Sequence, residues 1–182
     1  MILVPFIAFY YSRGGLFISR RVLIFSALFG ISFGFVEATV VVYLRAAVGL
    51  LPGYGGILSD VQNLSSGIYQ QSQILVELPK SLLITELFRE VATMVMLFSV
   101  AVLTVKTHKE RWAIFLWTFA AWDLFYYFGL WAIVRWPSSL LTPDVLFLIP
   151  VPWLSQVWFP MLVDSLTMIA VIAMVRQPRD LL

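Results

Sequence analysis

Apolar residues run in long uninterrupted blocks along this chain. Four blocks have about the 20 mostly apolar residues that a helix needs to cross a bilayer. The blocks cover residues 22–44, 82–105, 112–134 and 153–175. This pattern predicts an all-α integral membrane four-helix bundle, a single transmembrane domain over residues 1–182.

Two apolar segments fall outside these spans. Residues 1–11 are too few to cross a bilayer, so we expect an N-terminal segment that lies in the interface or packs on the bundle. The stretch from Trp136 to Trp153 is apolar but too rich in proline for a regular helix. We expect it to form a re-entrant or interfacial outer loop. Its prolines are Pro137, Pro143, Pro150 and Pro152.

The composition agrees with a membrane location. Hydrophobic residues make up 61% of the 182 residues and charged residues only 12%, about half the charged share of a soluble domain. A net charge of +2 gives no reason to expect nucleic acid as a partner. The chain has no cysteine, which excludes disulfides and thiolate chemistry.

The basic residues predict the orientation. If the four spans alternate, eight of the twelve lysines and arginines fall on one side of the membrane. Positive charge gathers on the cytoplasmic side. We therefore predict that both termini are cytoplasmic. The residues on that side are Arg13, Arg20, Arg21, Lys106, Lys109, Arg111, Arg176 and Arg179.

Ionisable groups inside the spans are the candidate functional residues, because charge in a bilayer is costly and seldom incidental. At a rise of about 1.5 Å per residue, Asp123 and Asp164 lie near the midplane and Glu37 and Glu90 about 5 Å outward. A compact bundle would bring these acids together. The full candidate polar site comprises Glu37, Glu86, Arg89, Glu90, Asp123, Tyr126, Tyr127, Asp144 and Asp164.

A structural role for these groups is an equal alternative. Arg89 shares a helix face with Glu86 and Glu90 and can pair with either. Glu86 is close enough to the interface that we expect it to be solvated. Asp164 is the acid for which the pattern favours a functional role over a structural one.

Small residues recur every four positions in the first span, at Ser26, Gly30, Gly34 and Ala38. Such a stripe lets another helix approach closely. It predicts a helix-packing face, with Glu37 beside it.

Several kinds of chemistry are missing from the sequence. The single histidine, His108, lies in a basic loop where we expect it to be solvated, which argues against haem, zinc and Ser-His-Asp chemistry. The sequence carries neither a zinc-protease nor a phosphate-loop motif. We predict no metal and no cofactor.

Four strings of sequence stand out together: residues 37–45 (EATVVVYLR), 86–97 (ELFREVATMVML), 122–127 (WDLFYY) and 141–153 (LTPDVLFLIPVPW). With these strings the chain resembles a group of bacterial multi-pass inner-membrane proteins of unknown activity. The resemblance extends over most of residues 34–160 and is most specific in its last string. It implies a bacterial inner (cytoplasmic) membrane location, brings no activity, and draws attention to Glu90, Asp123 and Asp144.

Three functions follow from these features. The first is a non-catalytic accessory or assembly subunit whose partner, besides the lipid bilayer, is a second copy or another membrane protein. The second is a component of proton- or ion-coupled transport. The third is a membrane enzyme acting on a lipid or isoprenoid, with Glu90 or Asp123 as acid or base. The small size and missing motifs favour the first, a protein that is not an enzyme.

Overall fold

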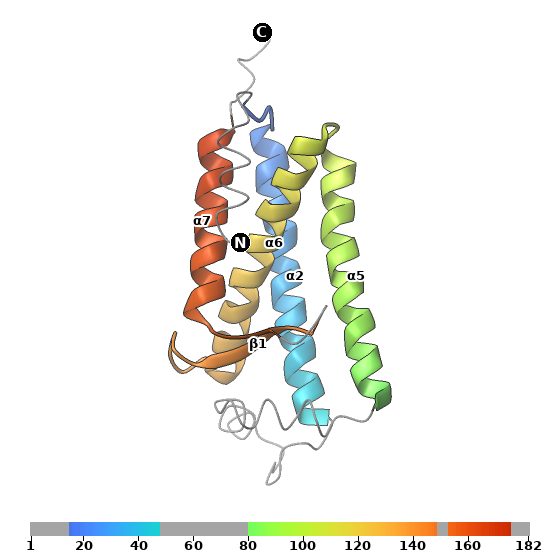
Figure 1. The fold of residues 1–182 in the computed structure, drawn as a ribbon, viewed down its shortest axis with the longest axis vertical. Helices are drawn as coiled ribbons and strands as arrows, with labels where there is room; N and C mark the ends of the chain where they lie inside the picture. Colours follow the sequence, from blue (N-terminus) through green and yellow to red (C-terminus); the bar gives the residue numbers. More distant parts are fainter. Residues whose placement is uncertain (1–14, 48–79, 149–152, 176–182) are drawn as a thin grey trace.

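A computed structural model describes residues 15–47, 80–148 and 153–175 (Figure 1). Within these residues, four helices run along one axis: α2 (Arg20–Ala47), α5 (Lys80–Thr104), α6 (His108–Val134) and α7 (Trp158–Met174). The mostly helical fold expected from the sequence is confirmed. The predicted N-terminal segment, residues 1–11, lies outside the described residues.

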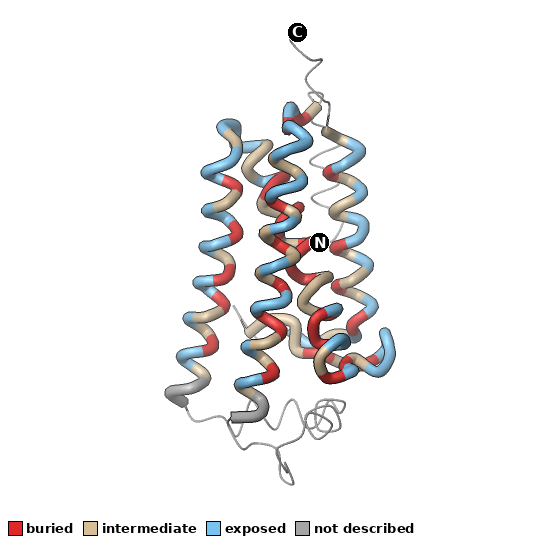
Figure 2. Tube along the Cα trace, turned by 180° about the vertical axis from the view of Figure 1, so that it is seen from behind, coloured by how far each residue is buried: buried red, intermediate tan, exposed pale blue. Residues whose placement is uncertain are grey.

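Three of these helices are long and apolar enough to span a membrane, namely α2, α5 and α6. Large apolar side chains remain exposed along their outer faces, for example Phe25, Phe88 and Leu103. Figure 2 shows the pattern as exposed residues on the outside of each helix and buried residues toward the centre. Side chains of this kind suit a lipid surround.

Helix α6 is the centre of the bundle. It packs most extensively on α2, then on α7 and α5, whereas α2 and α5 touch each other little. The small-residue stripe of α2 lies in the tightest contact: a Cβ added to Gly30 would meet the Thr118 carbonyl oxygen at 2.6 Å. Ala38 is fully buried and faces Gly129 of α6. Ser26 is buried as well and donates its hydroxyl to the Val22 carbonyl at 2.7 Å.

The segment between α6 and α7 contains an antiparallel hairpin that the sequence pattern does not predict. Its strands are β1 (Pro143–Phe147) and β2 (Trp153–Gln156), with a bulge between Val145 and Phe147. Proline is tolerated at the first position of a strand, where Pro143 lies. In Figure 1 the hairpin crosses the lower third of the bundle in front of α6 and reaches toward α5.

The fourth helix therefore begins later than the sequence pattern suggests. Residues 153–156 belong to β2, and the Val157 amide donates to the Thr142 carbonyl at 3.0 Å. An apolar run alone does not distinguish a buried strand from the start of a helix. The helix that remains has 17 residues, at the lower limit for a span.

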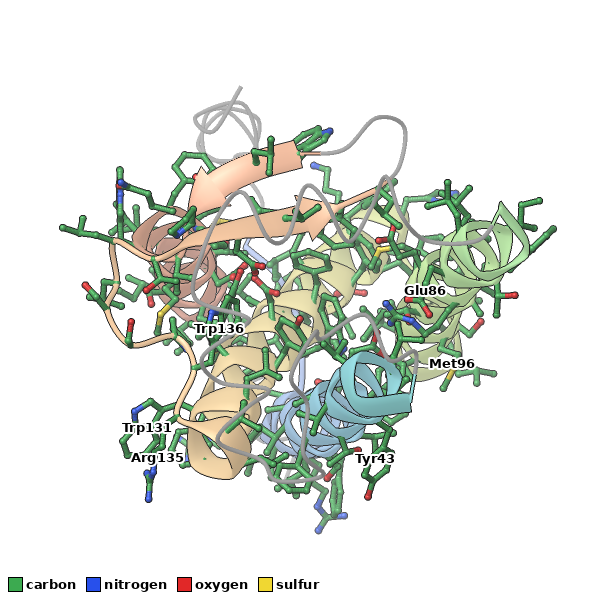
Figure 3. All side chains as sticks on the ribbon, turned by 90° about the horizontal axis from the view of Figure 1, so that it is seen from below. Tyr43, Glu86, Met96, Trp131, Arg135 and Trp136 are labelled. Atoms are coloured by element: carbon green, nitrogen blue, oxygen red, sulfur yellow. The ribbon has the colours of Figure 1, made fainter. Side chains whose placement is uncertain are left out.

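Two apolar clusters hold the ends of the bundle. One joins Leu16 and Ile18 to the α5–α6 connection, and the Leu16 amide donates to the Met174 carbonyl at 3.0 Å. The other surrounds Trp136, which is fully buried between α6 and the start of α7. Seen from the hairpin end in Figure 3, Trp136 lies inside the bundle, while Trp131 and Arg135 point outward.

Candidate functional site

The acidic residues of the spans gather at the level of the hairpin, around Arg89 of α5. Its guanidinium forms an ion pair with Glu37 of α2. Its Nε also donates to Glu86 Oε2 at 2.7 Å, one turn earlier in α5. One cation therefore joins two helices that otherwise touch little.

Glu86 is buried in this arrangement, with 9% of its surface exposed. The expectation that it would be solvated is wrong. The reason is that Arg89, three residues later on the same helix face, draws the carboxylate toward α2.

Glu90 connects α5 to the hairpin. Its two carboxylate oxygens accept the backbone N–H of Leu148 at 3.0 and 3.1 Å. Leu148 directly follows β1, so this bond fixes the end of the strand against α5. Backbone donors carry no signal in the sequence, and this partner could not be predicted.

A second acidic pair lies between α6 and α7. The carboxyl groups of Asp123 and Asp164 hydrogen-bond each other, and both residues are buried. Two carboxyl groups form such a bond only when at least one carries a proton. Among the described residues, Asp164 Oδ2 is buried and accepts no hydrogen bond from an N–H or hydroxyl donor.

Tyr127 links α6 to strand β1 of the hairpin. Its hydroxyl donates to Asp144 Oδ2 at 2.8 Å, and Asp144 Oδ1 accepts the Val145 N–H at 2.9 Å. Asp144 is 3% exposed and Tyr127 also 3% exposed. The bond therefore ties β1 to the centre of the bundle in a dry environment.

Removing the Tyr127 hydroxyl is expected to destabilise the hairpin. Tyr127→Phe deletes a buried hydrogen bond to a charged group, which contributes about 1.5–3 kcal/mol. Tyr43→Phe is the matched control, because Tyr43 is 69% exposed and its loss should change stability by less than about 0.5 kcal/mol. Unfolding in mixed micelles measures the difference, and hydrogen exchange of the Val145 amide should accelerate only in Tyr127→Phe. Equal stability of the two variants would show that this hydrogen bond does not stabilise the hairpin.

These groups surround one polar cavity of about 70 Å³. Its wall comes from α2, α5, α6 and β1, so no single helix forms it. Of the candidate residues, Glu86, Asp144 and Asp164 lie behind the wall and reach it through Arg89, Tyr127 and Asp123. The wall consists of Glu37, Val41, Arg89, Glu90, Thr93, Trp122, Asp123, Tyr126, Tyr127, Val145, Leu146 and Phe147.

A larger apolar groove of about 520 Å³ adjoins the polar cavity. It runs between α5 and α6, and Phe147 of β1 and Trp153 of β2 line it at the level of the hairpin. Glu90 and Phe147 belong to both walls, so the two spaces lie side by side at these two residues. Its remaining lining is Val91, Met94, Val95, Phe115, Leu116, Phe119 and Trp153.

Several lining residues were missed by sequence reasoning. Phe147 and Trp122 lie in strongly apolar stretches of the sequence. The pattern there does not distinguish a residue that lines a cavity from a core or lipid-facing residue. Trp122 is only 6% exposed, and its indole N–H has no hydrogen-bond partner among the described residues. A buried donor of this kind is costly unless a ligand or water satisfies it.

No group of three or more histidines and acids in residues 15–47, 80–148 and 153–175 is arranged to hold a metal ion. His108 is exposed at the start of α6, far along the helix from the cavity. Arg135 places its guanidinium 4.6 Å from the centre of the Trp131 ring. The side chain of Arg45 lies outside those described.

Neither a protein-family model, nor a curated protein, nor a solved structure matches this chain.

Proposed function

We propose that this chain is a multi-pass membrane protein that binds a single amphiphilic molecule from the bilayer. The polar end of the amphiphile would occupy the cavity around Glu90, and its apolar chain the groove between α5 and α6. One observation carries the proposal: a polar cavity and an apolar groove share two wall residues, Glu90 and Phe147.

The two spaces match the two ends of such a molecule. The groove is lined almost entirely by aliphatic and aromatic side chains, which gain nothing from water. The cavity offers carboxylates and the free indole N–H of Trp122. Ligand sites commonly combine an apolar lining with a few well-placed polar groups.

Lateral entry from the bilayer is consistent with the packing of α5. Helix α5 packs less extensively on α6 than α2 packs on α6. Helix α5 also makes few contacts with α2. The groove is open to the surroundings, since its lining residues Val91, Val95 and Trp153 are 46%, 59% and 48% exposed. A lipid chain could therefore reach the site without first leaving the membrane.

The membrane placement completes the proposal. The basic clusters favour cytoplasmic termini, which puts the cavity in the outer half of a bacterial inner membrane. The hairpin then forms a re-entrant roof over the site. Binding without chemistry accords with the accessory or assembly role that the sequence favours, and the further partner, a second copy or another subunit, stays a prediction.

A second candidate is an enzyme that acts on the bound amphiphile. The observation in its favour is that Asp123 lines the cavity and its carboxyl group meets that of Asp164 behind it. A carboxyl pair of this kind can donate or accept a proton. If the chain is an enzyme, Asp123→Asn should abolish turnover and leave binding within about threefold, since shape is kept. Proton- or ion-coupled transport stays a prediction that flux measurements would test.

Filling the groove tests the proposed function. In the double variant Val91→Trp, Val95→Trp, two indoles from α5 occupy the space meant for the apolar chain. Mass spectrometry of molecules that co-purify with the protein should show the bound amphiphile reduced by at least about tenfold, which corresponds to 1.4 kcal/mol.

The matched control is Val102→Trp, on the same helix but outside the groove lining. It should retain the amphiphile at the unsubstituted level. If the double variant and the control carry the same lipids in the same amounts, the groove is only a lipid-facing surface and the proposal fails.

A further inference from the structure

Aromatic rings form much of the polar cavity wall. Trp122, Tyr126, Tyr127 and Phe147 all line it. The Trp122 ring lies 6.3 Å from Tyr126 and 6.2 Å from Phe147, centroid to centroid. Tyr126 and Tyr127 meet edge to face at 5.3 Å. A cation held within about 6 Å of such ring faces is attracted by their quadrupoles.

The charged residues of the wall also make the cavity favour a cation. Glu37, Glu90 and Asp123 contribute carboxyl groups. Arg89 is the one cationic side chain among the described residues of the wall, and it is engaged by Glu37 and by Glu86 behind it. Formally, this guanidinium balances one of those two carboxylates and leaves the surroundings negative.

An anionic head would meet unfavourable surroundings there. Phosphate groups are bound by arginine forks and by the N–H groups of helix N-termini. The one guanidinium of the described wall already has two carboxylate partners, and the wall residues of α2, α5 and α6 come from helix interiors. A phosphate would also approach Glu90 and Asp123, with repulsion strengthened by the apolar surroundings.

The size of the cavity restricts the head further. Room for one water takes about 10–15 Å³, so about 70 Å³ admits only a small group. That is room for about five to seven waters, so a nucleotide is too large. The N–H of Trp122 would be satisfied by an oxygen atom beside the charged centre.

From this combination we propose that the cavity recognises an organic ammonium group, so that the amphiphile is a cationic amine lipid. This inference rests on the proposed function and specifies its ligand. Carboxylates of Glu37 and Glu90 would compensate the charge, and the rings of Trp122, Tyr126 and Phe147 would surround the nitrogen. The apolar groove would hold the chain that the nitrogen carries.

Matched dodecyl amphiphiles test the assignment. Purified protein in neutral maltoside micelles is titrated calorimetrically with dodecyltrimethylammonium, dodecanol and dodecyl phosphate, with protein-free micelles as the blank. We expect the ammonium compound to bind at least about tenfold more tightly than the other two, a difference of 1.4 kcal/mol. Glu90→Gln should weaken ammonium binding by a similar factor and leave dodecanol unchanged. Glu110→Gln, at the opposite end of α6, is the control and should bind like the parent protein.

The outcomes separate this inference from the proposed function. If dodecyl phosphate or dodecanol binds as tightly as the ammonium compound or more tightly, and Val91→Trp, Val95→Trp abolishes that binding, the amphiphile site stands and the ammonium assignment is overturned. If none of the three compounds binds, both fail. Ammonium binding that is unaffected by Glu90→Gln also overturns the assignment, because the charge is then compensated elsewhere.

Discussion

Replacing Arg89 with methionine is expected to destabilise the folded protein by about 3–5 kcal/mol, the usual cost of removing one partner from a buried ion pair. Two carboxylates depend on this guanidinium, Glu37 across the helix interface and Glu86 on the same helix. Their side chains are 7% and 12% exposed. Water therefore reaches little of either side chain to compensate the lost charge.

A rescue experiment shows whether charge is the cause. The triple variant Glu37→Gln, Glu86→Gln, Arg89→Met removes all three charges and keeps the shape of the acids. It should recover most of the stability lost in Arg89→Met, because a neutral group costs far less to bury than an unpaired charge. Unfolding by SDS in mixed micelles, followed by circular dichroism, measures each variant.

The control for Arg89 is Arg21→Met at the exposed start of α2. A surface arginine should contribute no more than about 1 kcal/mol. If Arg89→Met is no less stable than Arg21→Met, or if the triple variant is no more stable than the single one, the ion pair does not hold α5 to α2.

Replacing Gly34 with leucine is the second change with a large expected effect. A Cβ at this position would lie 2.3 Å from the Trp122 carbonyl oxygen and 2.9 Å from the Tyr126 backbone nitrogen. These are backbone atoms of α6, so no side-chain rotation relieves the clash. Helix α6 must move away from α2.

The consequence is a loss of both stability and binding. Overpacking typically costs about 1–3 kcal/mol. The moved helix carries Trp122, Asp123 and Tyr126, so the polar cavity should lose its shape and the protein its bound amphiphile. Ser32→Leu makes a similar enlargement on the exposed face of α2 and should leave both properties unchanged. Equal unfolding midpoints for the two variants would show that the close contact at Gly34 does not limit the packing.

The sequence predicts the helices well because long apolar blocks and the length of a span leave few alternatives. The hairpin escapes prediction for a physical reason. Its strand β1 has no alternation of polar and apolar residues, being held on one side by Glu90 and on the other by Tyr127. Such contacts come from distant helices and leave no local pattern. The late start of α7 follows from the same cause.

Prediction of the candidate site depends on the cost of charge in a membrane. Every ionisable residue of an apolar span is a candidate on that ground alone, which is how Asp123 and Asp164 are found. Counting the helix rise even places them at one depth. It cannot give the rotation of each helix about its axis, so the pairing of Asp123 with Asp164, and of Glu37 with Arg89, requires the three-dimensional structure. Apolar wall residues such as Phe147 carry no comparable signal.

The central claim, that an amphiphile occupies the joined cavity and groove, is tested most directly by site-specific photo-crosslinking in native membranes. A photoreactive phenylalanine at position 119 would lie in the groove wall. One at position 102 would lie on the exposed surface of α5, outside the groove. We expect the Phe119 position to crosslink one lipid species selectively and the Val102 position to capture the mixture of bulk lipids. The same lipid mixture at both positions would contradict the central claim.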